Sequence, residues 1–315
     1  MNGSDSVYNE KFGYAFARSF FLPALRPAFW KTVPSIFNNF FFFQFRSAIL
    51  PGRVAVTKVD HPLDEKIPFV PSWVTIYLDF VNFWVRLISF FLRRYKRRAY
   101  KPISDFIESM GRLYAFAAEV YTKNLSTTKR PFYIARPRFF LIHMVDPHLM
   151  CVPSLHVMIV IHAYTMFAVI AKQLNDEEGL KAQMLEMKQG ALAICQAILF
   201  VKQHSVNCIP AAFYAMTCFS PDLFPQKEAE AFTEKLFSPA PPAGKITAVC
   251  REHPSAAPPT KISGEDQAEI KNHILTLYRR FLAEGKTAKS WEEPLVNFLR
   301  DFNSYNTPAP RIKPS

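Results

Sequence analysis

Glycine is scarce in this sequence, with 9 residues in 315, whereas proline occurs 25 times. Nucleotide-binding α/β folds need glycine where the backbone approaches a phosphate, and the chain has neither a GxGxxG nor a P-loop pattern. The sequence therefore argues against a glycine-rich nucleotide-binding fold.

Cysteine frameworks and signal-peptide patterns are also lacking. The five cysteines are odd in number and irregularly spaced, and several lie in apolar segments, which indicates neither a disulfide framework nor a zinc site. The polar start, MNGSDSVYNE, does not have the basic-then-apolar order of a cleavable signal peptide.

Apolar residues make up half of the chain, and 31 of them are phenylalanine. They gather in stretches that fall short of the uncharged run of about 20 residues of an ideal membrane-spanning helix. A charge at mid-bilayer costs roughly 2.5–3.5 kcal/mol, so the charges in these stretches need partners or interior faces. The sequence predicts an all-α fold, a six-helix transmembrane bundle; the alternative is a soluble helical protein with a very aromatic core. The stretches are 33–50, 72–92, 107–121, 156–171, 190–201 and 209–219, and the charges are Asp79, Arg86, Arg112 and Glu119.

The net charge of +12 suits either nucleic acid or an anionic membrane surface. The densest basic cluster directly follows the second apolar stretch, as in a juxtamembrane anchor, so we expect the bilayer and no nucleic acid as a partner. With this cluster in the cytoplasm, both chain ends lie inside and the loops 51–71, 122–155 and 202–208 lie outside. The cluster comprises Arg93, Arg94, Lys96, Arg97, Arg98 and Lys101.

The chain divides into four predicted segments. Residues 1–32 mix aromatic and basic residues and form an interfacial segment, and residues 33–220 form the membrane domain. Residues 221–264 are a linker, and residues 265–315 a small helical cytoplasmic extension. The extension has apolar residues at helical spacing, and a possible helix start and stop in Ser263 and Gly285. Its apolar residues include Ile270, Ile274, Leu277, Tyr278, Phe281, Leu295, Phe298 and Leu299.

Three short segments on the predicted outer side, KRPFYIARP, VPSLH and KQHSVNC, carry residues suited to phosphoryl transfer. Cations and a hydroxyl can bind phosphate oxygens, while one histidine attacks phosphorus and another protonates the departing oxygen. No cofactor or metal is needed if side-chain cations stabilise the charge. Each segment alone also has a structural interpretation, as a solvated surface, a helix cap or a satisfied histidine, and His143, His148 and His162 are interpreted in that way. The candidates are Lys129, Arg136, Ser154, His156, Lys202 and His204.

Together and in this order, the segments resemble the phosphatidic acid phosphatase type 2/haloperoxidase superfamily. Its first motif is lysine-x6-arginine-proline, its second proline-serine-glycine-histidine, and its third ends in histidine-x3-aspartate; Leu155 replaces the glycine, as in a PSLH-type membrane branch. The resemblance covers roughly residues 60–220. It implies a metal-free extracytoplasmic site in which His204 is the phosphohistidine-forming nucleophile and His156 the general acid. Lys129, Arg136 and Ser154 would bind the phosphate of a phospholipid or lipid-phosphate substrate. Lys202 would substitute for the arginine that the third motif has six residues before its histidine, where this chain has Ile198.

The third motif departs from the family pattern, because Cys208 stands where the aspartate is expected. A neutral thiol orients and stabilises the nucleophilic imidazole poorly. Three explanations are open. Another carboxylate orients the histidine in place of the aspartate, with Asp146 as the candidate in a nearby loop; or the enzyme is slow; or the protein binds its ligand without catalysis. The expected function is a lipid-phosphate phosphatase or phosphotransferase; the alternative is an inactive relative that binds headgroups or scaffolds membrane partners.

Overall fold

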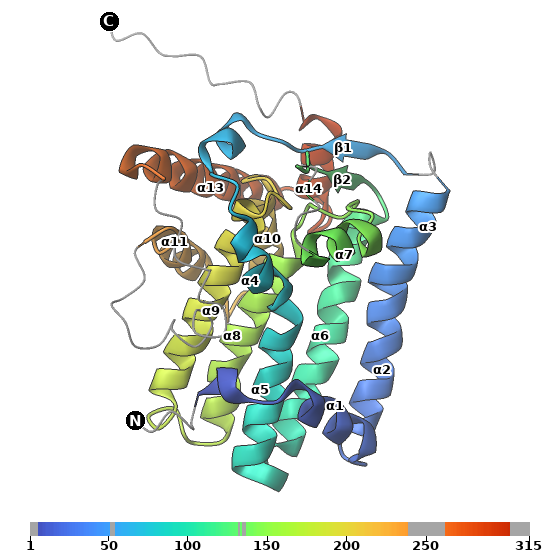
Figure 1. Cartoon of the computed structure of the whole chain (residues 1–315), viewed down its shortest axis with the longest axis vertical. Helices are drawn as coiled ribbons and strands as arrows, with labels where there is room; N and C mark the ends of the chain where they lie inside the picture. Colours follow the sequence, from blue (N-terminus) through green and yellow to red (C-terminus); the bar gives the residue numbers. More distant parts are fainter. Residues whose placement is uncertain (1–5, 51–53, 132, 134–136, 239–261, 303–315) are drawn as a thin grey trace, which may run out of the picture.

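Helices account for most of the structure, a computed structural model that describes residues 6–50, 54–131, 133, 137–238 and 262–302 (Figure 1). This confirms the predicted helical class. The helices are α1 (Phe12–Phe21), α2 (Arg26–Ile36), the π-helical η3 (Phe37–Phe42), α3 (Phe43–Ile49), α4 (Val74–Leu78), α5 (Phe80–Tyr95), α6 (Tyr100–Tyr121), α7 (Pro137–Val145), α8 (Leu155–Gln173), α9 (Lys181–Phe200), α10 (Cys208–Phe219), α11 (Gln226–Glu234), α13 (Gly264–Gly285) and α14 (Glu293–Arg300), with 3-10 turns η2 (Val7–Asn9), η4 (Pro62–Lys66), η5 (Pro71–Trp73) and η6 (Lys96–Ala99).

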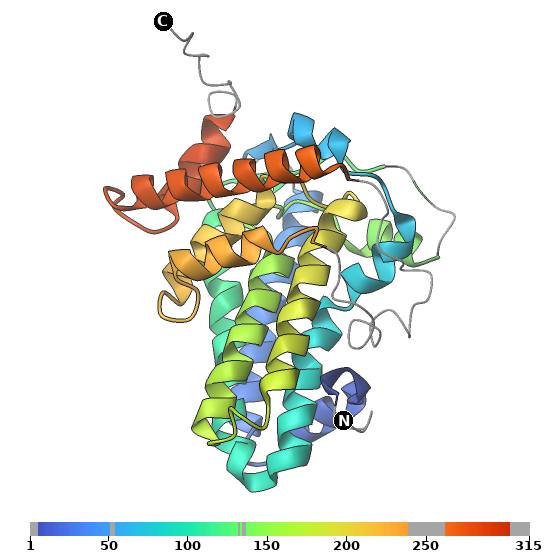
Figure 2. The same ribbon diagram turned by 90° about the vertical axis from the view of Figure 1, so that its left-hand side faces the viewer.

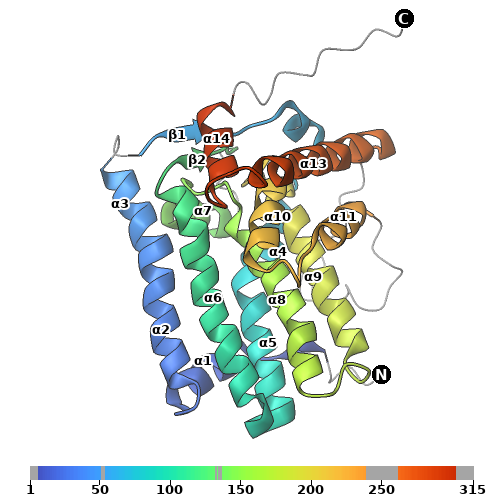
Figure 3. The same ribbon diagram turned by 180° about the vertical axis from the view of Figure 1, so that it is seen from behind.

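The long helices run lengthwise beside one another, and α2 continues through η3 into α3 (Figures 1 and 3). At one end of this bundle, strands β1 (Val56–Lys58) and β2 (Leu125–Thr127) pair in parallel, with Val56 opposite Leu125. The pairing ties the loop before α4 to the loop after α6. At the other end lie α1 and the basic turn η6 (Figure 1). We call these the loop end and the basic end.

The charges within the apolar stretches are partnered or exposed. Asp79 and Arg86 are largely buried and form an ion pair of 2.7 Å. Glu119 accepts a hydrogen bond of 2.7 Å from the Trp291 indole, and Arg112 is exposed. Breaking a buried pair by removing one partner leaves an uncompensated charge, so Asp79 and Arg86 depend on each other.

Two helical stretches are long and apolar enough to cross a membrane, Pro71–Tyr121 and Leu155–Gln173. In addition, helices α1 to α3 form an aromatic surface on which large apolar side chains are exposed to solvent. Its most exposed members are Phe21, Trp30, Phe37, Phe42 and Ile49. These features support association with a membrane.

The predicted sixth span does not run the length of the bundle. Helix α10 has 12 residues, or about 18 Å, whereas a bilayer core is about 30 Å thick. The chain then turns back, and the Thr217 hydroxyl lies 2.8 Å from that of Tyr278 in α13. The region predicted as a linker begins with α11, which buries Phe232 against Phe213.

The C-terminal extension lies across the loop end of the bundle (Figure 2). As its sequence predicts, α13 starts at Ser263, whose hydroxyl accepts from the Asp266 N–H at 3.0 Å, and it buries Ile270, Ile274, Leu277, Tyr278 and Phe281. Its predicted position across the membrane from the loop at 51–71 is wrong, because Lys66 forms an ion pair of 2.9 Å with Asp266. The short α10 is the physical reason, since it returns the chain to the end where it started.

Candidate functional site

Two of the predicted catalytic residues meet at the loop end. His156 lies in the first turn of α8, and His204 in the turn between α9 and α10. The Nδ1 atom of His156 is 3.4 Å from Nε2 of His204. The turn is folded back on α9, because the N–H groups of Gln203 and His204 both donate to the Ile198 carbonyl.

A third histidine joins them. The ring centre of His148 is 6.2 Å from that of His204, and its Nε2 lies 2.8 Å from the Thr128 hydroxyl. The sequence pattern gave His148 only a structural role, since no motif contains it. Its nearness to Asp146 in the sequence was the available signal.

An ion pair between Arg130 and Asp146 borders the histidines. The Arg130 Nη2 is 2.5 Å from Asp146 Oδ2, while Oδ1 accepts from the Gln44 amide at 2.6 Å and the His148 N–H at 2.9 Å. Burial opposes ionisation of Asp146, but Arg130 and His148 outweigh it and lower the pKa of this carboxyl. Asp146 is therefore a partly buried carboxylate that is ionised at neutral pH. Arg130 was missed in the sequence because only its neighbour Lys129 fits the motif.

The histidines enclose very little space. They line a cavity of about 20 Å³, which is room for about one water molecule. A phosphate would enter only if side chains moved, so the structure shows this site closed. The cavity is lined by Phe40, Gln44, Asp146, His148, Met150, Cys151, Leu155, His156 and His204.

Of the predicted phosphate-binding residues, the three that the structure describes do not line this cavity. The Lys129 side chain is exposed, and its backbone N–H donates to Asp60 at 2.7 Å. The Lys202 ammonium donates to the Asp64 carbonyl, and burial lowers its pKa. The buried Ser154 hydroxyl precedes α8 and has no hydrogen-bond partner among the described residues. Arg136 lies outside the described residues.

His204 has no carboxylate on its second ring nitrogen. Within the described part of the chain, its Nδ1 makes no hydrogen bond. Burial lowers the pKa of His204, and the neighbouring His156, His148 and Arg130 lower it further, while an interaction with the Cys151 backbone opposes the shift; the ring is neutral at pH 7. Cys208 is buried at the start of α10, where its N–H donates to the Ser205 carbonyl at 3.0 Å. The position expected for an orienting aspartate is thus occupied by a buried thiol.

The turn that carries His204 is held from two sides. The Asn207 amide donates to the Val59 carbonyl at 3.1 Å, and Asp64 accepts from the Val206 N–H at 2.8 Å. From α13, the His273 Nε2 lies 2.8 Å from Asn207 Oδ1. The extension thereby restrains the turn that carries His204.

This contact predicts an acid-sensitive attachment of α13. Burial and the neighbouring His61 lower the pKa of His273 to about 3, and burial also lowers the pKa of His61, although Glu269 opposes this. Because unfolding restores an ordinary pKa, stability is lost as the pH falls below about 6.5. Between pH 7 and pH 5, we expect the free energy of unfolding of the wild-type protein to fall by about 1–2 kcal/mol more than that of His273→Gln. Thermal unfolding at the two pH values measures this difference. Glutamine keeps a donor for Asn207 but does not titrate, so equal pH dependence in both proteins would contradict this role.

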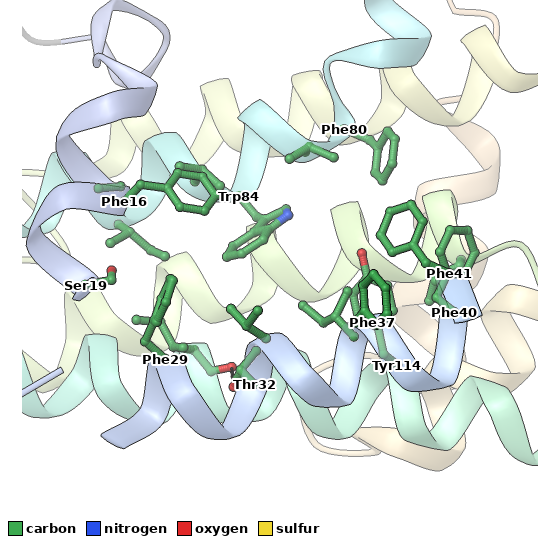
Figure 4. Close-up of a pocket in the computed structure, with 18 of the residues that line it drawn as sticks. Phe16, Ser19, Phe29, Thr32, Phe37, Phe40, Phe41, Phe80, Trp84 and Tyr114 are labelled. Carbon is green, nitrogen blue, oxygen red and sulfur yellow. Dashed lines mark hydrogen bonds between the residues drawn. The ribbon is translucent and has the colours of Figure 1, made fainter. Parts of the chain in front are cut away.

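A long apolar cavity of about 280 Å³ leads to His156 from the basic end (Figure 4). Phe16 and Phe29 line its far part, and Trp84 and Tyr114 face it from α5 and α6 (Figure 4). Phe40, Leu155 and His156 line both this cavity and the small histidine cavity. His156 therefore stands where an apolar channel meets a polar site.

Comparisons of the chain with protein-family models, with curated proteins and with solved structures found no match.

Proposed function

We propose that this protein is a membrane enzyme that transfers the phosphoryl group of a lipid phosphate through His204. The observation that carries the proposal is the position of His156 between two cavities. One is apolar and of a size suited to a hydrocarbon chain, and the other is surrounded by histidines and the Arg130–Asp146 pair. A lipid phosphate has the same division into an apolar tail and an anionic head.

The proposed reaction uses both close histidines. The neutral Nε2 of His204 attacks phosphorus, an N–P bond forms, and the bond from phosphorus to the lipid oxygen breaks. His156, protonated as the anionic phosphate binds beside it, gives this proton to the leaving oxygen, and then takes one from the water or alcohol that attacks the phosphohistidine. Arg130 can bind two phosphate oxygens once the cavity opens. The N–P bond breaks, inorganic phosphate or the new phosphate ester leaves, and His204 is regenerated.

The test is release of inorganic phosphate from lipid phosphates by purified protein in detergent. We expect release in the presence of EDTA, and its loss in both His204→Ala and His204→Gln. Glutamine retains bulk and hydrogen bonding at this position, so its inactivity separates nucleophilic chemistry from packing. An active His204→Gln protein would contradict the proposed reaction.

A second candidate is a protein that binds the headgroup without turning it over. It is favoured by Cys208 and by the unpartnered Nδ1 of His204. Saturable binding of a lipid phosphate to the folded wild-type protein, with no phosphate released, would support this candidate.

We further propose that the bundle spans the membrane with its basic end in the cytoplasm. The lengthwise helices would cross five times: α2 to α3, α5, α6, α8 and α9. Because η6 carries the basic cluster, the positive-inside rule places the histidines and the C-terminal extension outside. Helix α10 would enter and return on that side.

Cysteine labelling in intact cells tests this arrangement. In a background with Cys218→Ala and Cys250→Ala, we expect Glu65→Cys in η4 and Asn272→Cys in α13 to react with an impermeant reagent from outside. Glu178→Cys, between α8 and α9, should react only after the membrane is permeabilised. Labelling of the first two positions from opposite sides would refute the arrangement.

A further inference from the structure

A third cavity lies at the basic end, remote from the histidines, where α5 ends and α6 begins. It is a hollow of about 630 Å³, and residues of α1 form its other wall. Lys96 has a left-handed backbone, with φ of 51°, and so reverses the chain between α5 and η6. Four cations line the hollow beside Arg93: Arg18, Lys96, Arg97 and Arg98.

Few carboxylates pair with these cations. Arg93 pairs with Glu10 at 2.6 Å, and Arg98 donates to the Leu174 carbonyl at 2.9 Å. Within the described part of the chain, Arg18, Lys96 and Arg97 form no ion pair; Arg18 lies over the Tyr14 ring at 5.2 Å. Cations at the end of α5 complement its dipole, and Arg18, in the last turn of α1, complements the dipole of that helix, but no carboxylate of the described residues neutralises these three cations where the two helix ends meet. The hollow therefore has positive charge that an anion would neutralise.

The chemistry of the lining suits a phosphate group. Guanidinium groups bind two phosphate oxygens at once, and an ammonium group adds a point charge. Tyr14 and Tyr100 also line the hollow and can offer hydroxyl donors. The volume exceeds that of the histidine cavity many times, so an ester-linked headgroup fits without rearrangement.

The surroundings place this hollow at a membrane surface. Helix α1 exposes Phe12, Phe16, Phe20 and Phe21, and Trp30 is exposed nearby on α2. Aromatic residues gather where the headgroups of a bilayer meet its acyl chains, and a basic cluster beside a membrane helix attracts anionic lipids. The ring of Phe20 packs at 5.5 Å from that of Trp30, which continues this aromatic surface from α1 to α2.

We propose that this hollow binds the phosphate-bearing headgroup of an anionic membrane lipid, with the acyl chains lying against the aromatic surface of α1 and α2. It is a separate site from the histidines, since it lies at the opposite end of the bundle. Its ligand is bound and not converted.

Native mass spectrometry of the purified protein in neutral detergent tests the proposal with three probes. They are phosphatidylglycerol, zwitterionic phosphatidylcholine, and soluble inositol hexakisphosphate. The test variant combines Arg18→Gln, Lys96→Gln and Arg97→Gln. The control variant combines Lys31→Gln, Lys172→Gln and Lys181→Gln, which removes equal charge near the same end but outside the hollow.

We expect phosphatidylglycerol to bind more tightly than phosphatidylcholine, and the test variant to weaken it by about 100-fold, at about fivefold for each cation. The control variant should bind like wild type. Equal phosphatidylglycerol affinity in the test and control variants would overturn the proposal. So would a test variant that loses only inositol hexakisphosphate, since the ligand would then be a soluble polyanion. If the triple variant does not fold, the single variants Arg97→Gln and Lys96→Gln, both at exposed positions, are measured instead. Wild-type affinity for phosphatidylglycerol in both single variants would overturn the proposal.

Discussion

Replacing Cys208 by aspartate is expected to raise the rate of phosphate release by a factor of about 10² to 10⁴, the scale on which an orienting carboxylate acts on a catalytic histidine. The reason is the unpartnered Nδ1 of His204. A carboxylate would hold one tautomer of the ring and offset the positive charge that forms with the phosphohistidine. A neutral thiol supplies neither. The measurement is turnover of lipid phosphate by purified Cys208→Asp and wild-type proteins.

Two controls separate this gain from general effects. Cys208→Ser changes the thiol without adding charge and should leave turnover near that of wild type. His204→Ala should abolish turnover in both the wild-type and Cys208→Asp backgrounds. A folded but inert Cys208→Asp protein would favour headgroup binding over catalysis. A lower rate than wild type would mean that another group orients His204, and Asp146→Asn would then identify it.

Filling the apolar cavity is expected to discriminate against long-chain substrates. Val81 lines this cavity from α5, and Val81→Trp would occupy space used by a hydrocarbon chain. Excluding about three methylene groups costs about 2.4 kcal/mol, so kcat/KM for long-chain lipid phosphates should fall by about 50-fold. Short-chain substrates should be turned over at the wild-type rate.

Leu185→Trp provides the matched control, because Leu185 is exposed on α9 and does not line the cavity. It adds the same side chain to the surface and should change neither substrate class. Equal losses for short and long chains in Val81→Trp would contradict the role of the cavity as a chain-binding site.

The sequence predicted the meeting of His156 and His204, but only through their order among short motifs. Spacing along the chain does not place them, since 48 positions separate them. Turns at the ends of different helices bring them together. Arg130 and His148 were not predicted, because a loop residue acquires its role from the fold. Lys202 was expected to substitute for the arginine of the third motif, yet its backbone, with φ of 53°, and the Asp64 carbonyl hold its side chain away from the histidines.

The predicted separation of the C-terminal extension from the loop at 51–71 is wrong for a reason visible in the sequence. The stretch 209–219 has 11 residues, or about 17 Å of helix, which is too short to cross a bilayer of about 30 Å. The internal order of the extension was predictable, because Ser263 caps α13 and the apolar residues repeat at helical spacing. The surface against which α13 packs was not predictable, since nothing in the sequence links His273 to Asn207.

Trapping of the covalent intermediate tests the central claim most directly. Purified protein is mixed with a lipid phosphate, quenched in base to preserve acid-labile phosphohistidine, digested and examined by mass spectrometry. The proposed function predicts phosphate on His204, in larger amount in Cys208→Asp if formation limits turnover, and none in His204→Gln. Phosphate release without any phosphorylated His204 peptide, or phosphate on another residue in its place, would contradict the account.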